Sequence, residues 1–119
     1  MEELAWLTIN EECGLLRACL AGEVDMSNAA EFQEKLAGLT APNLVLDLSG
    51  VSFFDSSGIR MVVELWRQRL AAGQSLRLVV APGSPVHRVL TVAEVDGTVP
   101  VHHSWEEAVG QVGGPSPTG

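Results

Sequence analysis

Residues 51–59, Val-Ser-Phe-Phe-Asp-Ser-Ser-Gly-Ile, constrain the fold more than any other part of the chain. The apolar run 44–48 (Leu-Val-Leu-Asp-Leu), which is separated from them by two residues, is short and rich in branched side chains and so predicts a buried strand. After them, apolar residues recur with helical spacing over 59–72. Residues 55–58, Asp-Ser-Ser-Gly, are therefore predicted to lie where a strand passes into the first turn of a helix.

The first turn of a helix has a chemistry of its own. Its backbone N–H groups lack intrahelical partners, and the helix dipole adds partial positive charge there. A serine hydroxyl at this place either caps the helix or carries a phosphate in a field that favours negative charge. Taken alone, so short a motif favours capping.

The rest of the chain predicts an α/β fold, a mixed β-sheet of four to five strands with three to four helices packed against it. Two strands come first and strands then alternate with helices, which is the order expected of a mixed sheet. Strands are expected at 4–9, 14–21, 44–48, 75–81 and 99–101, with a hairpin across the polar residues 10–12. Helices are expected from Ser27 or Asp25 as N-cap to about Leu39, at 59–72, from Ser84-Pro85, and from Ser104 through Val109.

The helix at 59–72 has a clear apolar stripe. Its spacing predicts that one face packs on the sheet, made of Ile59, Val62, Val63, Trp66 and Leu70. Met61 and Leu65 lie off that stripe, in an i, i+4, i+8 line with Ser57. Two interpretations stay open for this pair: an apolar docking strip for a partner protein, or core packing on a wider stripe.

Length and charge restrict the classes of function. A chain of 119 residues forms a single domain, here expected over 1–109, followed by a Gly-, Pro- and Ser-rich tail at 110–119 that we expect to be disordered. The net charge of −8 disfavours a direct nucleic-acid binder and favours a basic protein surface as partner. The chain has no apolar run long enough to insert in a membrane, and its acidic start is unlike a secretory signal, so we expect a cytoplasmic protein.

The residues that usually carry catalysis or bind metals do not gather into a site. Cys13 and Cys19 fit no zinc spacing, and His87, His102 and His103 have no ligand spacing with them or with a carboxylate cluster. Ser57 is not in a Gly-x-Ser-x-Gly elbow, and the chain has no Gly-rich phosphate loop with a lysine. We therefore expect no metal, no cofactor, no catalytic residues and no enzymatic activity.

Three motifs in order resemble a known family. Residues 22–25 (Gly-Glu-Val-Asp), 46–51 (Leu-Asp-Leu-Ser-Gly-Val) and 54–58 (Phe-Asp-Ser-Ser-Gly) are similar to successive signatures of the STAS domain, in its stand-alone anti-sigma factor antagonist branch. The resemblance covers roughly 4–109 and includes the last helix. It departs after the third helix, where family members often have a glycine and this chain has Thr-Val-Ala-Glu-Val at 91–95.

The resemblance implies a bacterial partner-switching protein. In such proteins the serine that corresponds to Ser57 is phosphorylated by an anti-sigma factor that is itself a serine kinase. The unphosphorylated antagonist binds that kinase and frees the sigma factor, and a serine phosphatase resets the system. The alternative within the family is an accessory subunit of a membrane transport ATPase complex that lacks the phosphorylation switch.

The residues around Ser57 give further expectations. Gly58 has no side chain to obstruct a partner's approach. Asp55 either caps the helix or accepts a hydrogen bond from the partner, and Asp25 either flanks the serine or is an N-cap. Together with Ser56, Met61 and Leu65, these residues make up the expected partner-binding surface. Arg60 is the one nearby cation.

Overall fold

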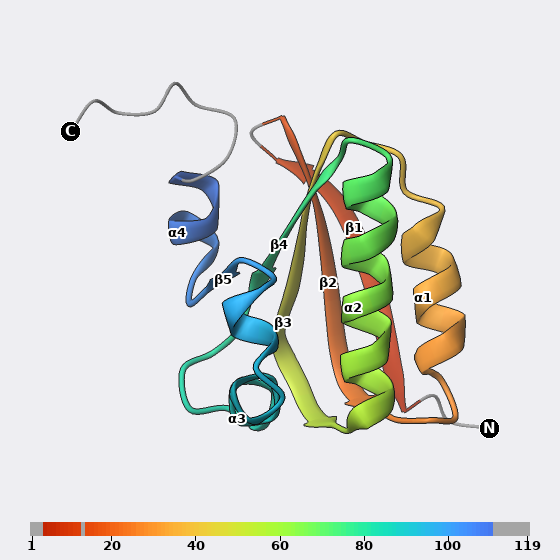
Figure 1. Ribbon diagram of the computed structural model, residues 1–119, viewed down its shortest axis with the longest axis vertical. Helices are drawn as coiled ribbons and strands as arrows, with labels where there is room; N and C mark the ends of the chain where they lie inside the picture. The colour runs from red at the N-terminus through yellow and green to blue at the C-terminus, as the bar shows by residue number, and fades with distance from the viewer. Residues whose placement is uncertain (1–3, 13, 111–119) are drawn as a thin grey trace.

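The computed structural model describes residues 4–12 and 14–110, which form a five-stranded sheet of order β1-β2-β3-β4-β5 (Figure 1). β1 pairs with β2 antiparallel, and the other neighbouring strands are parallel. The predicted mixed α/β sheet is confirmed. The elements in order are β1 (Ala5–Glu12), β2 (Leu15–Val24), α1 (Ala29–Ala37), β3 (Asn43–Phe54), α2 (Ser56–Ala71), β4 (Ser75–Val79), α3 (Pro85–Val92), the short 3-10 helix η1 (Val95–Gly97), β5 (Val101–His102) and α4 (Trp105–Gly110).

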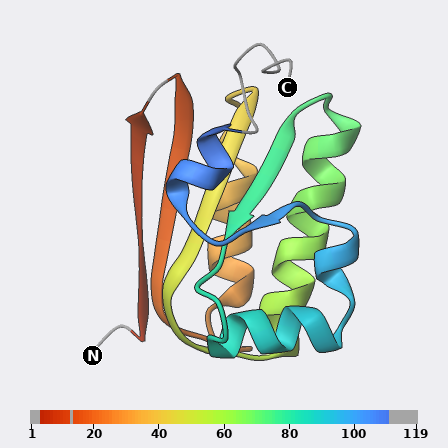
Figure 2. The same cartoon turned by 90° about the vertical axis from the view of Figure 1, so that its left-hand side faces the viewer.

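The helices lie on both faces of the sheet. α1 and α2 run side by side along one face and α3 lies across its lower end, while α4 lies over the opposite face (Figures 1 and 2). None of the helices in the described residues is long and apolar enough to cross a membrane. The expected tail falls mostly at 111–119, outside the described residues, and Gly110 still belongs to α4.

Three strand predictions were too short. β2 continues past the expected end at Ala21 to Val24. The polar residues 10–12 were expected to form the hairpin turn, but they belong to β1. Glu12 pairs with Leu15, so the turn lies after Glu12. An edge strand with a solvated face tolerates polar side chains, which is why the polar gap was misread as a turn. β3 continues past Leu48 to Phe54, so that its last residue lies directly before the Asp-Ser-Ser-Gly segment.

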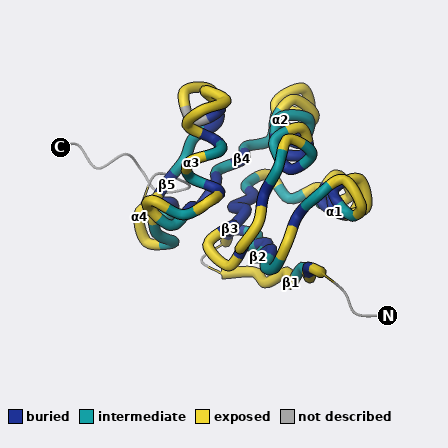
Figure 3. Tube along the Cα trace, turned by 90° about the horizontal axis from the view of Figure 1, so that it is seen from below, coloured by how far each residue is buried: buried dark blue, intermediate teal, exposed yellow. Residues whose placement is uncertain are grey.

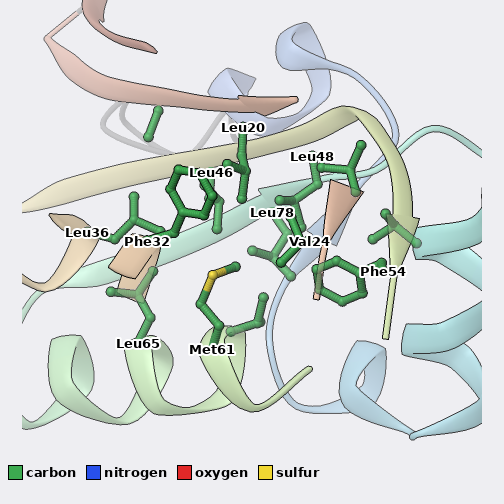
Figure 4. Close-up of a cluster of buried hydrophobic side chains, with 14 of the residues drawn as sticks. Leu20, Val24, Phe32, Leu36, Leu46, Leu48, Phe54, Met61, Leu65 and Leu78 are labelled. Carbon is green, nitrogen blue, oxygen red and sulfur yellow. The ribbon is translucent and has the colours of Figure 1, made fainter. Parts of the chain in front are cut away.

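The docking strip predicted for Met61 and Leu65 is wrong. Both side chains are in the core, with exposed fractions of 1% and 0%. Figure 4 shows them pointing from α2 toward the buried side chains of α1 and the sheet, Leu36 and Leu46 among them. A side chain that solvent does not reach cannot contact a docked partner, so the alternative of core packing is the correct one.

The buried face of α2 is rotated about the helix axis from the apolar stripe predicted from the sequence, and it includes a buried arginine. That face consists of Gly58, Met61, Val62, Leu65 and Arg69, whereas Leu70 is 59% exposed. Arg69 donates from Nε to the Ser75 carbonyl at 2.7 Å and from Nη1 to the Leu39 carbonyl at 2.9 Å. Nη2 also donates to the Ala41 carbonyl. These hydrogen bonds tie the end of α2 to the connection between α1 and β3 and to the start of β4. A charged residue in such a role escapes a search for apolar residues.

α4 is held on the sheet by a charged residue of β2. Nη2 of Arg17 lies 2.8 Å from Oδ2 of Asp47, and its guanidinium stacks 4.6 Å from the ring centre of Trp105. Burial opposes ionisation of Asp47, but the hydrogen bonds from Arg17 and Ser49 outweigh it and lower the pKa of that carboxyl. The Asp47 in the second signature motif thus has a structural role in the described residues.

The turn after α3 has the conformation that a glycine would favour. Glu94 has φ +60° and ψ 23°, in the left-handed region, and it is the one non-glycine residue with positive φ in the described chain. This is the segment where the sequence lacks the glycine that is often present in the family it resembles. An L side chain in this conformation costs about 1–2 kcal/mol per residue.

We predict that Glu94→Gly stabilises the protein by about 1 kcal/mol, because it removes this backbone strain at a smaller entropic cost in the unfolded chain. The free energy of unfolding measured in urea tests it. Ala93→Gly is the matched control: Ala93 has φ −83°, so this change should destabilise the protein. Equal effects of the two substitutions would contradict the prediction.

Candidate functional site

Two turns meet at one end of the sheet. The last residues of two parallel neighbours, Val24 of β2 and Phe54 of β3, are paired in register. Asp25 and Asp55 directly follow them, so the turns that lead into α1 and α2 lie side by side at the lower end in Figure 1. This arrangement is the one expected from the sequence.

Asp55 is the N-cap of α2. Its Oδ1 accepts a hydrogen bond from the Ser57 N–H at 2.8 Å. Its carbonyl accepts from the N–H groups of Gly58 at 3.0 Å and Ile59 at 3.2 Å. Capping is thus one established role of Asp55, and it starts the helix at Ser56, earlier than the apolar pattern indicated. A contact between Asp55 and a partner stays a prediction.

The two serines occupy the first turn of α2, with Ser56 exposed and Ser57 half-buried. The backbone N–H of Ser57 is engaged by Asp55, whereas its hydroxyl makes no hydrogen bond within the described residues. The hydroxyl of Ser56 likewise has no partner there. The helix start is therefore capped without either hydroxyl, so both hydroxyls are available for other chemistry.

Both serines line a hollow of about 420 Å³ between the N-terminal ends of α1 and α2, which we call the serine hollow. Its other lining residues are Met26, Ala29, Ala30, Gln33 and Arg60. Met26 is 85% exposed, and Arg60 is exposed. The hollow thus combines hydroxyls, an amide and a cation with an apolar rim.

The sequence did not indicate the contribution of α1 to this hollow. Met26 and Gln33 were not among the expected site residues. An apolar Met between Asp25 and Ser27, in an otherwise polar turn, was the available signal.

Asp25 stabilises its own turn. Its Oδ1 accepts hydrogen bonds from the hydroxyl and from the backbone N–H of Ser27, and these bonds lower the pKa of the Asp25 carboxyl. The N-cap of α1 is Asn28, not Ser27 or Asp25 as expected. Asn28 braces the turn by accepting from the Asp25 N–H at 3.0 Å and donating to the Glu23 carbonyl at 2.9 Å. The carboxylate of Asp25 does not line the serine hollow.

The role expected for Gly58 is wrong. The residue is buried, so it does not lie open to a partner. A Cβ at this position would lie 2.5–2.7 Å from atoms of the Phe54 ring, which is itself buried. Gly58 is required because α2 packs closely against the end of β3, and the sequence motif alone does not distinguish this internal requirement from an external one.

His87, His102 and His103 do not line the serine hollow. The rings of His87 and His103 are 5.0 Å apart in an edge-on arrangement. Within the described ranges, no three His, Cys, Asp or Glu residues gather in a group that could hold a metal ion.

The chain was compared with protein families and with known proteins. The family model described as "Mlab, STAS domain" matches residues 7–101. The anti-sigma-F factor antagonist RsfB of Mycobacterium tuberculosis is 30% identical over 112 residues, which cover 91% of this chain and 89% of RsfB.

Solved structures share the fold. A crystal structure of an anti-sigma factor antagonist from Mycobacterium paratuberculosis is 22% identical with a TM-score of 0.83, and the match covers 91% of this chain and 93% of that one. The unphosphorylated form of SpoIIAA, a Bacillus protein, is 19% identical with a TM-score of 0.72, over 90% of this chain and 96% of SpoIIAA.

We predict that Gly58→Ala destabilises the protein by about 1–2 kcal/mol, because overpacking against Phe54 outweighs the better helix propensity of alanine. Thermal and urea unfolding measure the change. Gly38→Ala is the control, since a Cβ there would meet only two backbone carbonyl oxygens, at 3.5 and 3.9 Å, and φ is −76°. That substitution should be neutral or slightly stabilising. A neutral Gly58→Ala would mean that Phe54 moves aside freely.

Proposed function

Because this chain belongs to the STAS domain family, we propose that it is an anti-sigma factor antagonist controlled by phosphorylation of Ser57. In its unphosphorylated state it binds an anti-sigma factor that is a serine kinase, and so frees the sigma factor. The kinase transfers a phosphoryl group to Ser57, and a serine phosphatase removes it. The chain acts as ligand and substrate in the cytoplasm, not as a catalyst.

The observation that carries this proposal is the unengaged hydroxyl of Ser57. A kinase acceptor needs a hydroxyl that is accessible and has no competing hydrogen bond. Ser57 lies at a hollow on the surface, and Asp55 takes over the capping role that would otherwise occupy a serine. The names of two similar proteins agree with the proposal: RsfB is an anti-sigma-F factor antagonist, and SpoIIAA has an unphosphorylated form.

The position of Ser57 also explains why a phosphate would end binding. A phosphoryl group adds about −1.5 to −2 charge at neutral pH. At Ser57 this charge would stand beside the carboxylate of Asp55 and inside the area that the partner covers. Arg60, which lines the same hollow, can balance only part of this charge, and the uncompensated remainder costs several kcal/mol when it is buried in an interface. Asp25, Asp55 and Ser56 are proposed to surround the contact.

The accessory subunit of a transport ATPase remains the second candidate from this family. It has less support, because the curated relative above is named as an antagonist and because a subunit without a switch has no need of the free Ser57 hydroxyl. Stable association with a transport ATPase, with no phosphorylation by any anti-sigma kinase of the source organism, would favour it.

We predict that the two adjacent serines behave differently. With an anti-sigma serine kinase of the source organism and ATP, tandem mass spectrometry should find the phosphate on Ser57. Ser56→Ala should still be phosphorylated at little cost in stability, because Asp55 rather than Ser56 caps the helix.

The affinity for the kinase should fall when position 57 carries a negative charge. Ser57→Ala should bind constitutively, and Ser57→Asp should bind at least ~100-fold more weakly, since each ~1.4 kcal/mol is tenfold in affinity. Isothermal titration calorimetry measures both. Phosphate on Ser56, or on neither serine with an active kinase, would contradict the assignment.

We further predict that Arg60 pairs with the phosphate once Ser57 is modified. Residues three apart on a helix are neighbours, and both side chains line the serine hollow. A nearby cation favours the dianion, so the second pKa of the phosphate should be lower in the phosphorylated wild type than in phosphorylated Arg60→Ala. A ³¹P NMR titration compares the two, with phosphorylated Arg67→Ala as control because Arg67 pairs with Glu64 instead. Identical titration curves would exclude the pairing.

A further inference from the structure

The basic side chains of this acidic chain are nearly all engaged. The chain has seven lysines and arginines and fifteen aspartates and glutamates, which gives the net charge of −8, and all seven basic residues lie in the described part of the chain. Five have hydrogen-bond, ion-pair or other partners: Arg17, Lys35, Arg67, Arg69 and Arg77. Arg60 and Arg88 have no such partner within the described ranges.

The two unpaired arginines lie on either side of the first turn of α2. Arg60 lines the serine hollow on the α1 side. Arg88 lines a second hollow of about 260 Å³, the α2–α3 hollow, together with Ile59, Val89, Val92 and Ala93. Figure 3, the view from below, shows α1 and α3 on the two sides of α2. The helical period explains the split, because Ser57 and Arg60 face one side of α2 and Ile59 another.

The same two hollows hold the most exposed large apolar side chains. Met26 is 85% and Val92 is 84% exposed, and the next such residue in the described chain, Leu70, is 59% exposed. Met26 lines the serine hollow and Val92 the α2–α3 hollow. Each hollow thus combines one strongly exposed apolar side chain with one unpaired cation, a composition typical of a surface that a partner covers.

We propose that the two hollows and the turn between them form one docking surface for an acidic, amphipathic segment of a partner protein. Apolar side chains of the segment cover Met26 and Val92, and its carboxylates pair with Arg60 and Arg88. This inference rests on the proposed function, in that the segment belongs to the anti-sigma factor that binds the unphosphorylated chain.

The charges around the two hollows favour an acidic segment over a basic one as the binding partner. The net charge of −8 suggests a basic partner, but the carboxylates next to the surface are engaged in their own turns, Asp25 with Ser27 and Asp55 with Ser57. Among the residues that line the two hollows, the charged ones are Arg60 and Arg88, so the lining itself is cationic. A second copy of the chain is disfavoured as occupant because two chains of charge −8 repel each other.

The test uses the full ¹⁵N-labelled chain and a synthetic helical peptide with a leucine face flanked by glutamates. We expect its addition to shift the amide resonances of Ile59, Val89 and Val92 together with that of Ser57. A peptide with lysines in place of the glutamates should bind much more weakly. Arg88→Glu should weaken binding of the acidic peptide about tenfold, through the lost ion pair and the new repulsion.

Matched variants separate local contacts from long-range effects. Arg67→Glu changes the net charge as Arg88→Glu does, but Arg67 lies outside both hollows and should leave the affinity nearly unchanged. Val92→Ser should weaken binding, while Leu70→Ser, at an exposed apolar residue outside both hollows, should not.

Three outcomes would overturn the inference: no shifts at the α2–α3 hollow, equal binding of the lysine peptide, or equal losses in Arg67→Glu and Arg88→Glu. Shifts of the same resonances with protein concentration alone would identify a second copy as the occupant and would also overturn it. Phosphorylation of Ser57 is measured separately. If a kinase modifies Ser57 but the acidic peptide does not bind, this inference fails and the proposed function stands. If the peptide binds but no anti-sigma kinase phosphorylates the chain, the docking surface stands and the proposed phosphorylation fails.

Discussion

The parallel pairing of β2 and β3 up to their last residues determines where the site lies. Since Val24 and Phe54 are neighbours in register, the two chains leave the sheet together and enter α1 and α2 from adjacent positions. The serine hollow is the space between those two helix starts. A shift of one residue in this pairing would turn Phe54 from the core to the opposite face and would separate the two turns.

α2 is fixed on the sheet near both ends by interactions of different kinds. At its start, the absence of a side chain on Gly58 lets the helix approach the Phe54 ring. Near its end, Arg69 donates hydrogen bonds to the carbonyls of Leu39 and Ala41, in the connection between α1 and β3, and to that of Ser75, the first residue of β4. A helix held in this way presents its first turn in a constant position, which a surface recognised by another protein requires.

Much of this arrangement could be predicted from the sequence, because short-range patterns specify it. The first half of β3 at 44–48, the helix after Asp55 and the Ser84-Pro85 helix start all follow from local propensity and capping. The errors arose where tertiary packing decides. The buried face of α2 depends on Arg69, which no hydrophobic pattern reveals, and the reason for Gly58 depends on a ring four residues earlier that only the packed structure brings against it. Met26 lines the site only because α1 packs next to α2, and this contact joins residues far apart in the sequence.

The cap on α2 has a consequence for how a covalent modification at Ser57 would affect the fold. Since Asp55 secures the helix through the backbone of Ser57 and not through its hydroxyl, that oxygen can gain or lose a substituent while the hydrogen bonds of the helix start persist. The two forms would then share one scaffold and differ at one spot on its surface. A substituent of this kind would be added and removed without refolding, so the same molecule could pass through many cycles of modification. A kinase that docks over the marked spot would also be expelled by its own product, which frees it for the next copy.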